Sequence, residues 1–127
     1  MNSDAHVLVV SRDQMLLQTR KLILGAFFEV DAAGRVPEAE VLMAKTDIDL
    51  IVLCYSLSDD EYSKMIDLAN RQDPPPKILT LCSPSYGHSR AGCDQEFIVE
   101  NGPYALLKKI AEMVGLPIKG STRVVPV

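Results

Sequence analysis

The 127-residue sequence predicts an α/β fold, a doubly wound parallel sheet of five strands with helices on both faces. Two observations support this prediction. Short, apolar, β-branched runs recur along the chain, and stretches whose apolar residues have helical spacing separate them. Strands that alternate with helices in this way form a parallel sheet that is covered on both sides. For this length we expect the flavodoxin-like strand order 2-1-3-4-5.

The central strand is expected at Asp49–Cys54, an almost unbroken apolar run that suits a strand buried on both faces. The other strands are expected at residues 6–10, 28–32, 78–82 and 96–99. Ligands of open α/β sheets bind outside the carboxyl ends of the strands. Cys54, the last residue of the central strand, is therefore expected to face a site.

Four helices are expected between and after these strands. They run from Gln14 to Leu24, from Pro37 to about Lys45, from a Ser58-x-x-Glu61 capping box onward, and from Pro103 to about Met113. Residues 83–92 contain Pro and Gly and read as a loop with at most one helical turn. We expect one domain over residues 1–117 and a carboxyl-terminal tail over residues 118–127.

Composition and charge restrict the function. The formal net charge is −4, which argues against generic binding to nucleic acid or to anionic membranes. No apolar run approaches the ~20 residues of a membrane span, and three cysteines fit reduced thiols, so a cytoplasmic location is expected. The sequence has neither of the common glycine-rich nucleotide motifs, and no cofactor is expected.

Several segments, in their order and spacing, carry a family resemblance. They are Val7–Val10 followed by a polar turn, residues 28–33, Asp49–Leu53, Gly92-Cys93-Asp94, and Leu106-Leu107-Lys108-Lys109-Ile110. From about His6 to Leu116, the chain resembles the receiver domain of bacterial two-component response regulators. This resemblance implies the fold predicted above and a role in phosphorelay signal transduction. It also implies that the fourth helix of the receiver pattern is shortened or missing here, because residues 82–92 leave little room for it.

Receivers transfer a phosphoryl group to an aspartate at the end of the third strand, and an acidic pair holds Mg²⁺ beside it. The positions that match receiver function carry other residues here: Ser11 and Arg12 for the acidic pair, with Asp13 nearby; Cys54 for the acceptor; Cys82, then Ser83, for the hydroxyl; Phe97 for the aromatic switch; and Glu100 for the lysine. A thiol cannot form the acyl phosphate, and the swapped charges at Arg12 and Glu100 oppose metal and phosphate binding.

We therefore expect a pseudo-receiver that is not an enzyme, holds no metal, and binds a protein partner without phosphorylation. We expect it to bind neither nucleic acid nor a membrane, and to be a monomer or weak homodimer. Arg12 is expected either to fill the metal position, paired with Asp13 or Glu100, or to point to solvent.

Two alternatives stay open. Cys54 and Cys82 are expected at the ends of adjacent strands, where they could form a thiol redox sensor with Arg12 lowering a thiol pKa. Inert, buried thiols are the simpler interpretation, because no C-x-x-C spacing supports the redox pair. The third hypothesis is a flavodoxin-like domain that binds a small ligand.

Overall fold

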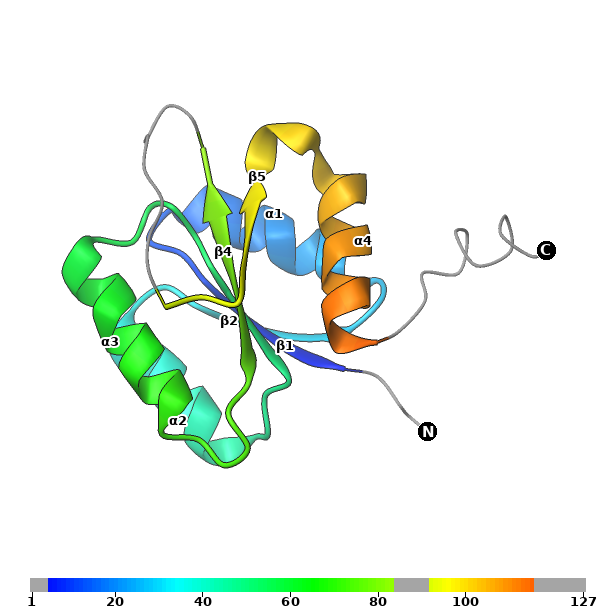
Figure 1. The fold of residues 1–127 in the computed structure, drawn as a ribbon. Helices are drawn as coiled ribbons and strands as arrows, with labels where there is room; N and C mark the ends of the chain where they lie inside the picture. Colours follow the sequence, from blue (N-terminus) through cyan, green and yellow to red (C-terminus); the bar gives the residue numbers. More distant parts are fainter. Residues whose placement is uncertain (1–4, 84–91, 116–127) are drawn as a thin grey trace.

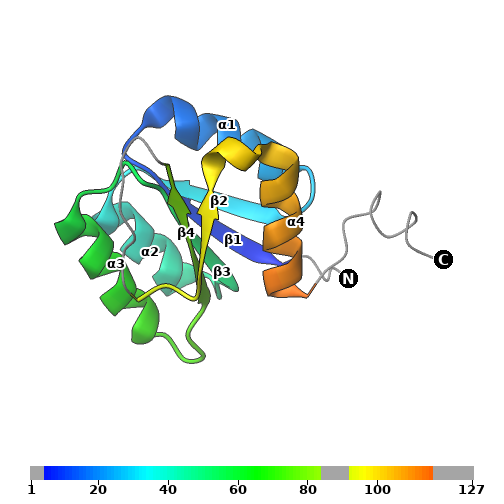
Figure 2. The same ribbon diagram turned by 45° about the horizontal axis from the view of Figure 1, so that its top comes forward.

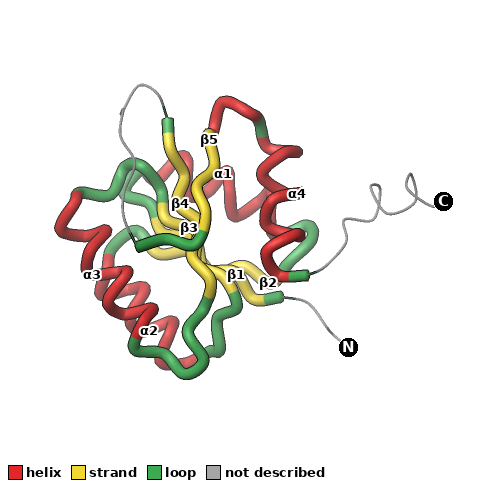
Figure 3. The backbone as a smooth tube through the Cα atoms, viewed as in Figure 1, coloured by secondary structure: helices red, strands yellow, loops and turns green. Residues whose placement is uncertain are grey.

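The computed structural model describes residues 5–83 and 92–115 and confirms the predicted fold. Its five-stranded parallel sheet has the order β2-β1-β3-β4-β5, which is the predicted order 2-1-3-4-5 (Figure 3). The strands are β1 (His6–Val10), β2 (Glu29–Ala33), β3 (Leu50–Leu53), β4 (Lys77–Cys82) and β5 (Gln95–Ile98). Each predicted strand is present, with its ends shifted by one residue at most.

Helices cover both faces of the sheet. They are α1 (Gln14–Gly25), α2 (Val36–Lys45), α3 (Asp59–Asn70) and α4 (Pro103–Val114), and a short 3-10 helix, η1 (Val99–Asn101), joins β5 to α4. The helices α1 and α4 pack on one face, and α2 and α3 pack on the other (Figures 1 and 2). The fold is therefore a three-layer sandwich with a hydrophobic cluster on each side of the sheet.

Local capping explains where two helices begin. The Asp13 carboxylate accepts a hydrogen bond from the Leu16 N–H at 3.1 Å, so Asp13 caps α1. The predicted capping box of α3 is confirmed. The Ser58 hydroxyl accepts from the Glu61 N–H at 3.1 Å, and the Glu61 carboxylate accepts from the Ser58 N–H at 2.9 Å.

Alternation along the central strands assigns each buried side chain to one face. In β3, Val52 packs in the cluster with α1 and α4, whereas Ile51 and Leu53 pack in the cluster with α2 and α3. Successive side chains of a strand point to opposite faces. If the alternation continues past Leu53, Cys54 points toward α1.

Two sequence-based expectations fall wholly or mostly outside the described residues. The expected shortening of the fourth receiver helix concerns residues 82–92, of which 84–91 lie outside the described ranges, and so does the expected tail over residues 118–127. Within the described ranges, no helix has the length and apolar character that a membrane span requires.

Candidate functional site

The candidate site lies at the carboxyl ends of β1 and β3. The Cys54 N–H donates to the Val10 carbonyl at 3.0 Å, which fixes the residue after β3 beside the end of β1. Cys54 and Ser11, the residues that follow these two strands, are both fully buried. The structure thus brings together two of the sequence-predicted site residues at the expected edge of the sheet.

A buried arginine that the sequence analysis did not single out also reaches this site. The Arg20 guanidinium donates a hydrogen bond to the Cys54 Sγ at 3.0 Å, and only 9% of Arg20 is exposed. Arg20 belongs to the buried stripe of α1, three residues after Leu17 and four before Leu24. A charged side chain within an apolar helical stripe is the signal that could have identified it.

The environment of Cys54 favours its thiolate. Burial alone raises the pKa of the thiol, but the Arg20 guanidinium and hydrogen bonds from the Ser56 N–H and the Ser11 and Ser56 hydroxyls outweigh it. The net effect is a pKa below the ordinary value of a cysteine. The site therefore contains a buried cation and a thiol that is predisposed to carry the matching negative charge.

Hydroxyl groups line the rest of this edge. The Ser11 Oγ lies 3.1 Å from the Ser56 Oγ, and the Ser56 Oγ accepts a hydrogen bond from the Arg12 N–H at 3.0 Å. The Asp13 N–H donates to the Ser11 Oγ at 3.2 Å. These neutral groups order the two loops that follow β1 and β3 without adding a carboxylate to the site.

Of the two arrangements expected for Arg12, pairing with Asp13 or Glu100 is wrong, and the structure favours a side chain that points outward. The side chain of Arg12 is 55% exposed and forms an ion pair with Glu61 on α3. The pKa of Glu61 is lowered, first by the hydrogen bond from the Ser58 N–H and then by the Arg12 guanidinium. Burial raises this pKa but is outweighed. Asp13 is directed to the amino end of α1 as its cap, so Arg12 finds its carboxylate on a neighbouring helix.

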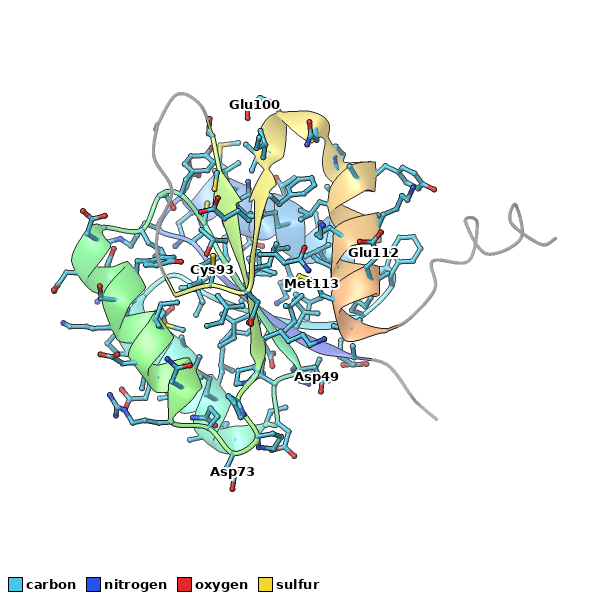
Figure 4. The ribbon with its side chains drawn as sticks, viewed as in Figure 1. Asp49, Asp73, Cys93, Glu100, Glu112 and Met113 are labelled. Carbon is cyan, nitrogen blue, oxygen red and sulfur yellow. The ribbon has the colours of Figure 1, made fainter. Side chains whose placement is uncertain are left out.

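Glu100 and Ser83 contact each other at the neighbouring strand ends. The Ser83 hydroxyl donates to the Glu100 carboxylate at 2.9 Å. Figure 4 shows Glu100 beyond the carboxyl end of β5, at the opposite end of the sheet from Asp49. Phe97 is buried in β5 beside Leu81 of β4 and packs in the cluster with α1 and α4.

The two cysteines of the proposed redox pair belong to adjacent strand ends, as expected, but to opposite faces of the sheet. In the β3–β4 register Leu53 lies beside Thr80, which places Cys54 level with Leu81. Cys54 contacts Arg20 of α1, whereas Cys82 has the same alternation as Thr80, whose hydroxyl contacts α3. This geometry does not favour a disulfide between them.

The sequence analysis also missed a polar pair in the core. The Tyr62 Oη of α3 lies 2.8 Å from the Thr80 Oγ1 of β4, and both residues are buried. Nothing in the sequence connects Tyr62 with Thr80, which is 18 residues away.

A metal centre is not assembled by the residues that the structure describes. In residues 5–83 and 92–115, no group of three His, Cys, Asp or Glu side chains is close enough together to hold an ion. At the position of the acidic pair, Ser11 offers a hydroxyl, Arg12 a cation, and Asp13 a carboxylate already used as a helix cap. These groups do not fit Mg²⁺, which prefers carboxylate oxygens.

Comparison with known proteins defines the class of fold. No family model matches the sequence, and no curated protein matches it. The structure, however, is similar to solved receiver domains. At the level of the fold, the resemblance seen in the sequence is confirmed.

Three of these structures are a CheY-like response regulator receiver domain from Methanospirillum hungatei, chemotaxis protein CheY4 from Vibrio cholerae, and a CheY-like receiver domain from Methylobacillus flagellatus. The first has a TM-score of 0.74 and 23% identity, and covers 89% of this chain and 95% of its own. The second has a TM-score of 0.72 and 20% identity, and covers 87% of this chain and 99% of its own. The third has a TM-score of 0.73 and 14% identity, and covers 87% of this chain and 99% of its own. The chain therefore has a receiver-type fold.

Proposed function

We propose that this chain is an atypical receiver-like signalling module, which binds a protein partner in a two-component-type pathway without being phosphorylated. The observation that carries the proposal is the Arg20–Cys54 pair at the carboxyl end of β3. In a receiver-type fold this is the position of the phosphoryl acceptor. Here it is filled by a buried thiol and a cation supplied by the protein itself.

The acceptor position argues against phosphoryl transfer in two ways. Cys54 has no exposed surface, so a phosphoryl donor has no direct approach to its sulfur. The Arg20 guanidinium already gives Cys54 a charge partner. A thiol cannot form the acyl phosphate of a receiver. Arg20 and Cys54 are also charge partners of each other without a bound phosphate.

The groups around the acceptor argue in the same direction. Phosphoryl transfer needs cations that neutralise the charge on the phosphoryl oxygens. Glu100 contributes an anion next to Ser83, and Arg12 is turned outward to Glu61. A negative charge beside a bound phosphate is unfavourable, so this arrangement opposes phosphate.

An exposed apolar surface on α1 supports binding to a protein partner. The helix α1 has two exposed large apolar side chains, Met15 at 79% and Leu22 at 78% exposure, two turns apart on the same side. Apolar side chains seven residues apart on one helix face are a spacing by which a helix docks into a groove of another protein. The proposed module would present this surface constitutively, because no phosphorylation step controls it.

Acetyl phosphate and Mg²⁺ test the proposal. We expect the intact mass of the folded chain to stay unchanged after incubation with both. An ordinary receiver domain treated in parallel, which has its acidic residues, should gain a phosphoryl group and serves as the positive control. A stoichiometric, Mg²⁺-dependent phosphoryl adduct on this chain would overturn the proposal.

A further inference from the structure

An apolar cavity of about 200 Å³ opens between α1, the end of β5, η1 and the amino end of α4. Figure 2 shows η1 and the beginning of α4 next to α1. The walls consist mainly of apolar side chains, which include Leu16, Ile23, Phe97 and Leu106. Cavities that are mostly apolar and have a few polar groups are typical of small-ligand sites.

Arg20 is the charged residue in this lining. It is nine-tenths buried, and of its five N–H donors the described contacts account for one, which bonds the Cys54 Sγ. Cys54 itself does not line the cavity, so it holds the guanidinium from the side of the sheet. Arginine binds carboxylates through several N–H donors at once, so the donors that Cys54 does not use favour a carboxylate within the cavity.

The amino end of α4 adds a second feature that favours an anion. Gly102 and Pro103, which begin this helix of 12 residues, both line the cavity. No side chain caps this helix end, and its first turn contains no acidic residue. The amino end of a helix carries a partial positive charge and favours anions.

We propose that this cavity binds a small apolar monocarboxylate, with the carboxylate toward Arg20 and the amino end of α4 and the apolar body against Ile23 and Leu106. The size of the ligand follows from the volume. A protein cavity of about 150 Å³ accommodates benzene. A cavity of about 200 Å³ therefore suits a phenyl ring or a chain of similar size together with its carboxylate. This inference goes beyond the proposed signalling role and does not rest on it.

Titration of the full ¹⁵N-labelled chain with phenylacetate, followed by NMR, tests the inference. We expect saturable shifts that are concentrated at Ile23, Val99 and the beginning of α4. Phenylacetamide, which has the same shape without the charge, should bind about tenfold more weakly, because a charge-assisted hydrogen bond is lost. No saturable shift with phenylacetate, equal binding of acid and amide, or shifts centred elsewhere would overturn the inference.

A matched pair of variants assigns the charge. Arg20→Gln should reduce the affinity for phenylacetate about tenfold, to that of the amide. Lys21→Gln makes the same charge change at an exposed neighbour that does not line the cavity, and should leave binding unchanged. Equal effects of the two substitutions would contradict the proposed role of Arg20.

A third variant keeps the inference testable if Arg20→Gln does not fold. Ile23→Trp fills the cavity from a half-buried position on α1. It should abolish binding of both compounds, and undiminished binding would contradict the location of the site. None of these measurements involves phosphorylation, so their outcome is separable from the test with acetyl phosphate.

Discussion

The two faces of the sheet bury polar pairs of different kinds. Between α3 and β4, the hydroxyls of Tyr62 and Thr80 share a hydrogen bond at 2.8 Å. Between α1 and the end of β3, Arg20 donates to Cys54 at 3.0 Å. The first pair is neutral, whereas the second places a thiol with a lowered pKa beside a buried cation. The same scaffold therefore contains an inert polar pair on one face and an electrostatically demanding pair on the other.

The location of the demanding pair is informative. Burying a charge pair gives little net stability, and removing one partner is costly, so stability alone is a weak reason to have one. Groups with perturbed pKa values are more frequent at functional sites. The Arg20–Cys54 pair lies at the carboxyl edge of the sheet and beside the cavity, whereas Tyr62 and Thr80 lie within the core.

The largest effect on stability is expected from a substitution that removes one partner of the Arg20–Cys54 pair. Cys54→Ala should lower the free energy of unfolding by about 3 kcal/mol, because it leaves the Arg20 cation buried without its anion. Urea unfolding near neutral pH measures this loss of stability. Cys93→Ala makes the same chemical change at a half-buried position and should cost about 1 kcal/mol or less. Equal losses in the two variants would show that Arg20 does not depend on Cys54.

The next effect is the pH dependence of the charged pair. The folded state lowers the pKa of Cys54, so between the folded and unfolded pKa values the unfolded chain binds more protons, and stability rises with pH. The contribution is complete above the unfolded value of about 8.5 and is lost as the pH falls through the folded value. The stability difference between the wild type and Cys54→Ser should therefore grow toward alkaline pH, by at most about 1.4 kcal/mol per pH unit. A difference that is constant or shrinks would contradict a thiolate in the folded state.

The neutral pair should respond differently. Tyr62→Phe removes the hydroxyl that satisfies Thr80 and should cost about 1 kcal/mol, with no dependence on pH near neutrality. Tyr104→Phe removes a hydroxyl from a residue that is 57% exposed and should change stability by about 0.5 kcal/mol or less. If the two variants were equally stable, the buried hydrogen bond would contribute nothing.

The smallest effect concerns the exposed arginine. Arg12→Ala should cost about 0.5 kcal/mol or less, because its ion pair with Glu61 lies at the surface. The loss should shrink further in about 1 M salt, where exposed charges are screened. A loss as large as that of Cys54→Ala would place Arg12 in the buried site after all.

The strands, their order and the inner face of α4 could be predicted because burial produces a local pattern. The run over Leu50–Leu53 is apolar without interruption, and the apolar positions of α4 recur at helical spacing. Each pattern needs only neighbouring residues, and the connection rules of parallel sheets then restrict the topology. The edge of the sheet that carries the site follows from this topology.

Side-chain contacts between residues that are far apart in the sequence could not be predicted in the same way. Arg20 occupies a buried position of α1, but a charged residue is expected at the surface unless its partner is known. That partner, Cys54, is 34 residues away. Arg12 was expected to pair with Asp13 or Glu100 or to point to solvent, yet Asp13 caps α1 and Arg12 pairs with Glu61 of α3. These contacts depend on tertiary packing.

Beryllofluoride with Mg²⁺, a mimic of the phosphoryl group, tests the central claim most directly, with backbone NMR as the readout. The account predicts no saturable shifts at Ser11, Cys54 or Ser83 beyond those caused by fluoride and Mg²⁺ alone, because the carboxylates that would hold metal and phosphoryl group are replaced. Saturable, Mg²⁺-dependent shifts centred on Cys54 would contradict it and would show that this edge of the sheet still binds a phosphoryl group.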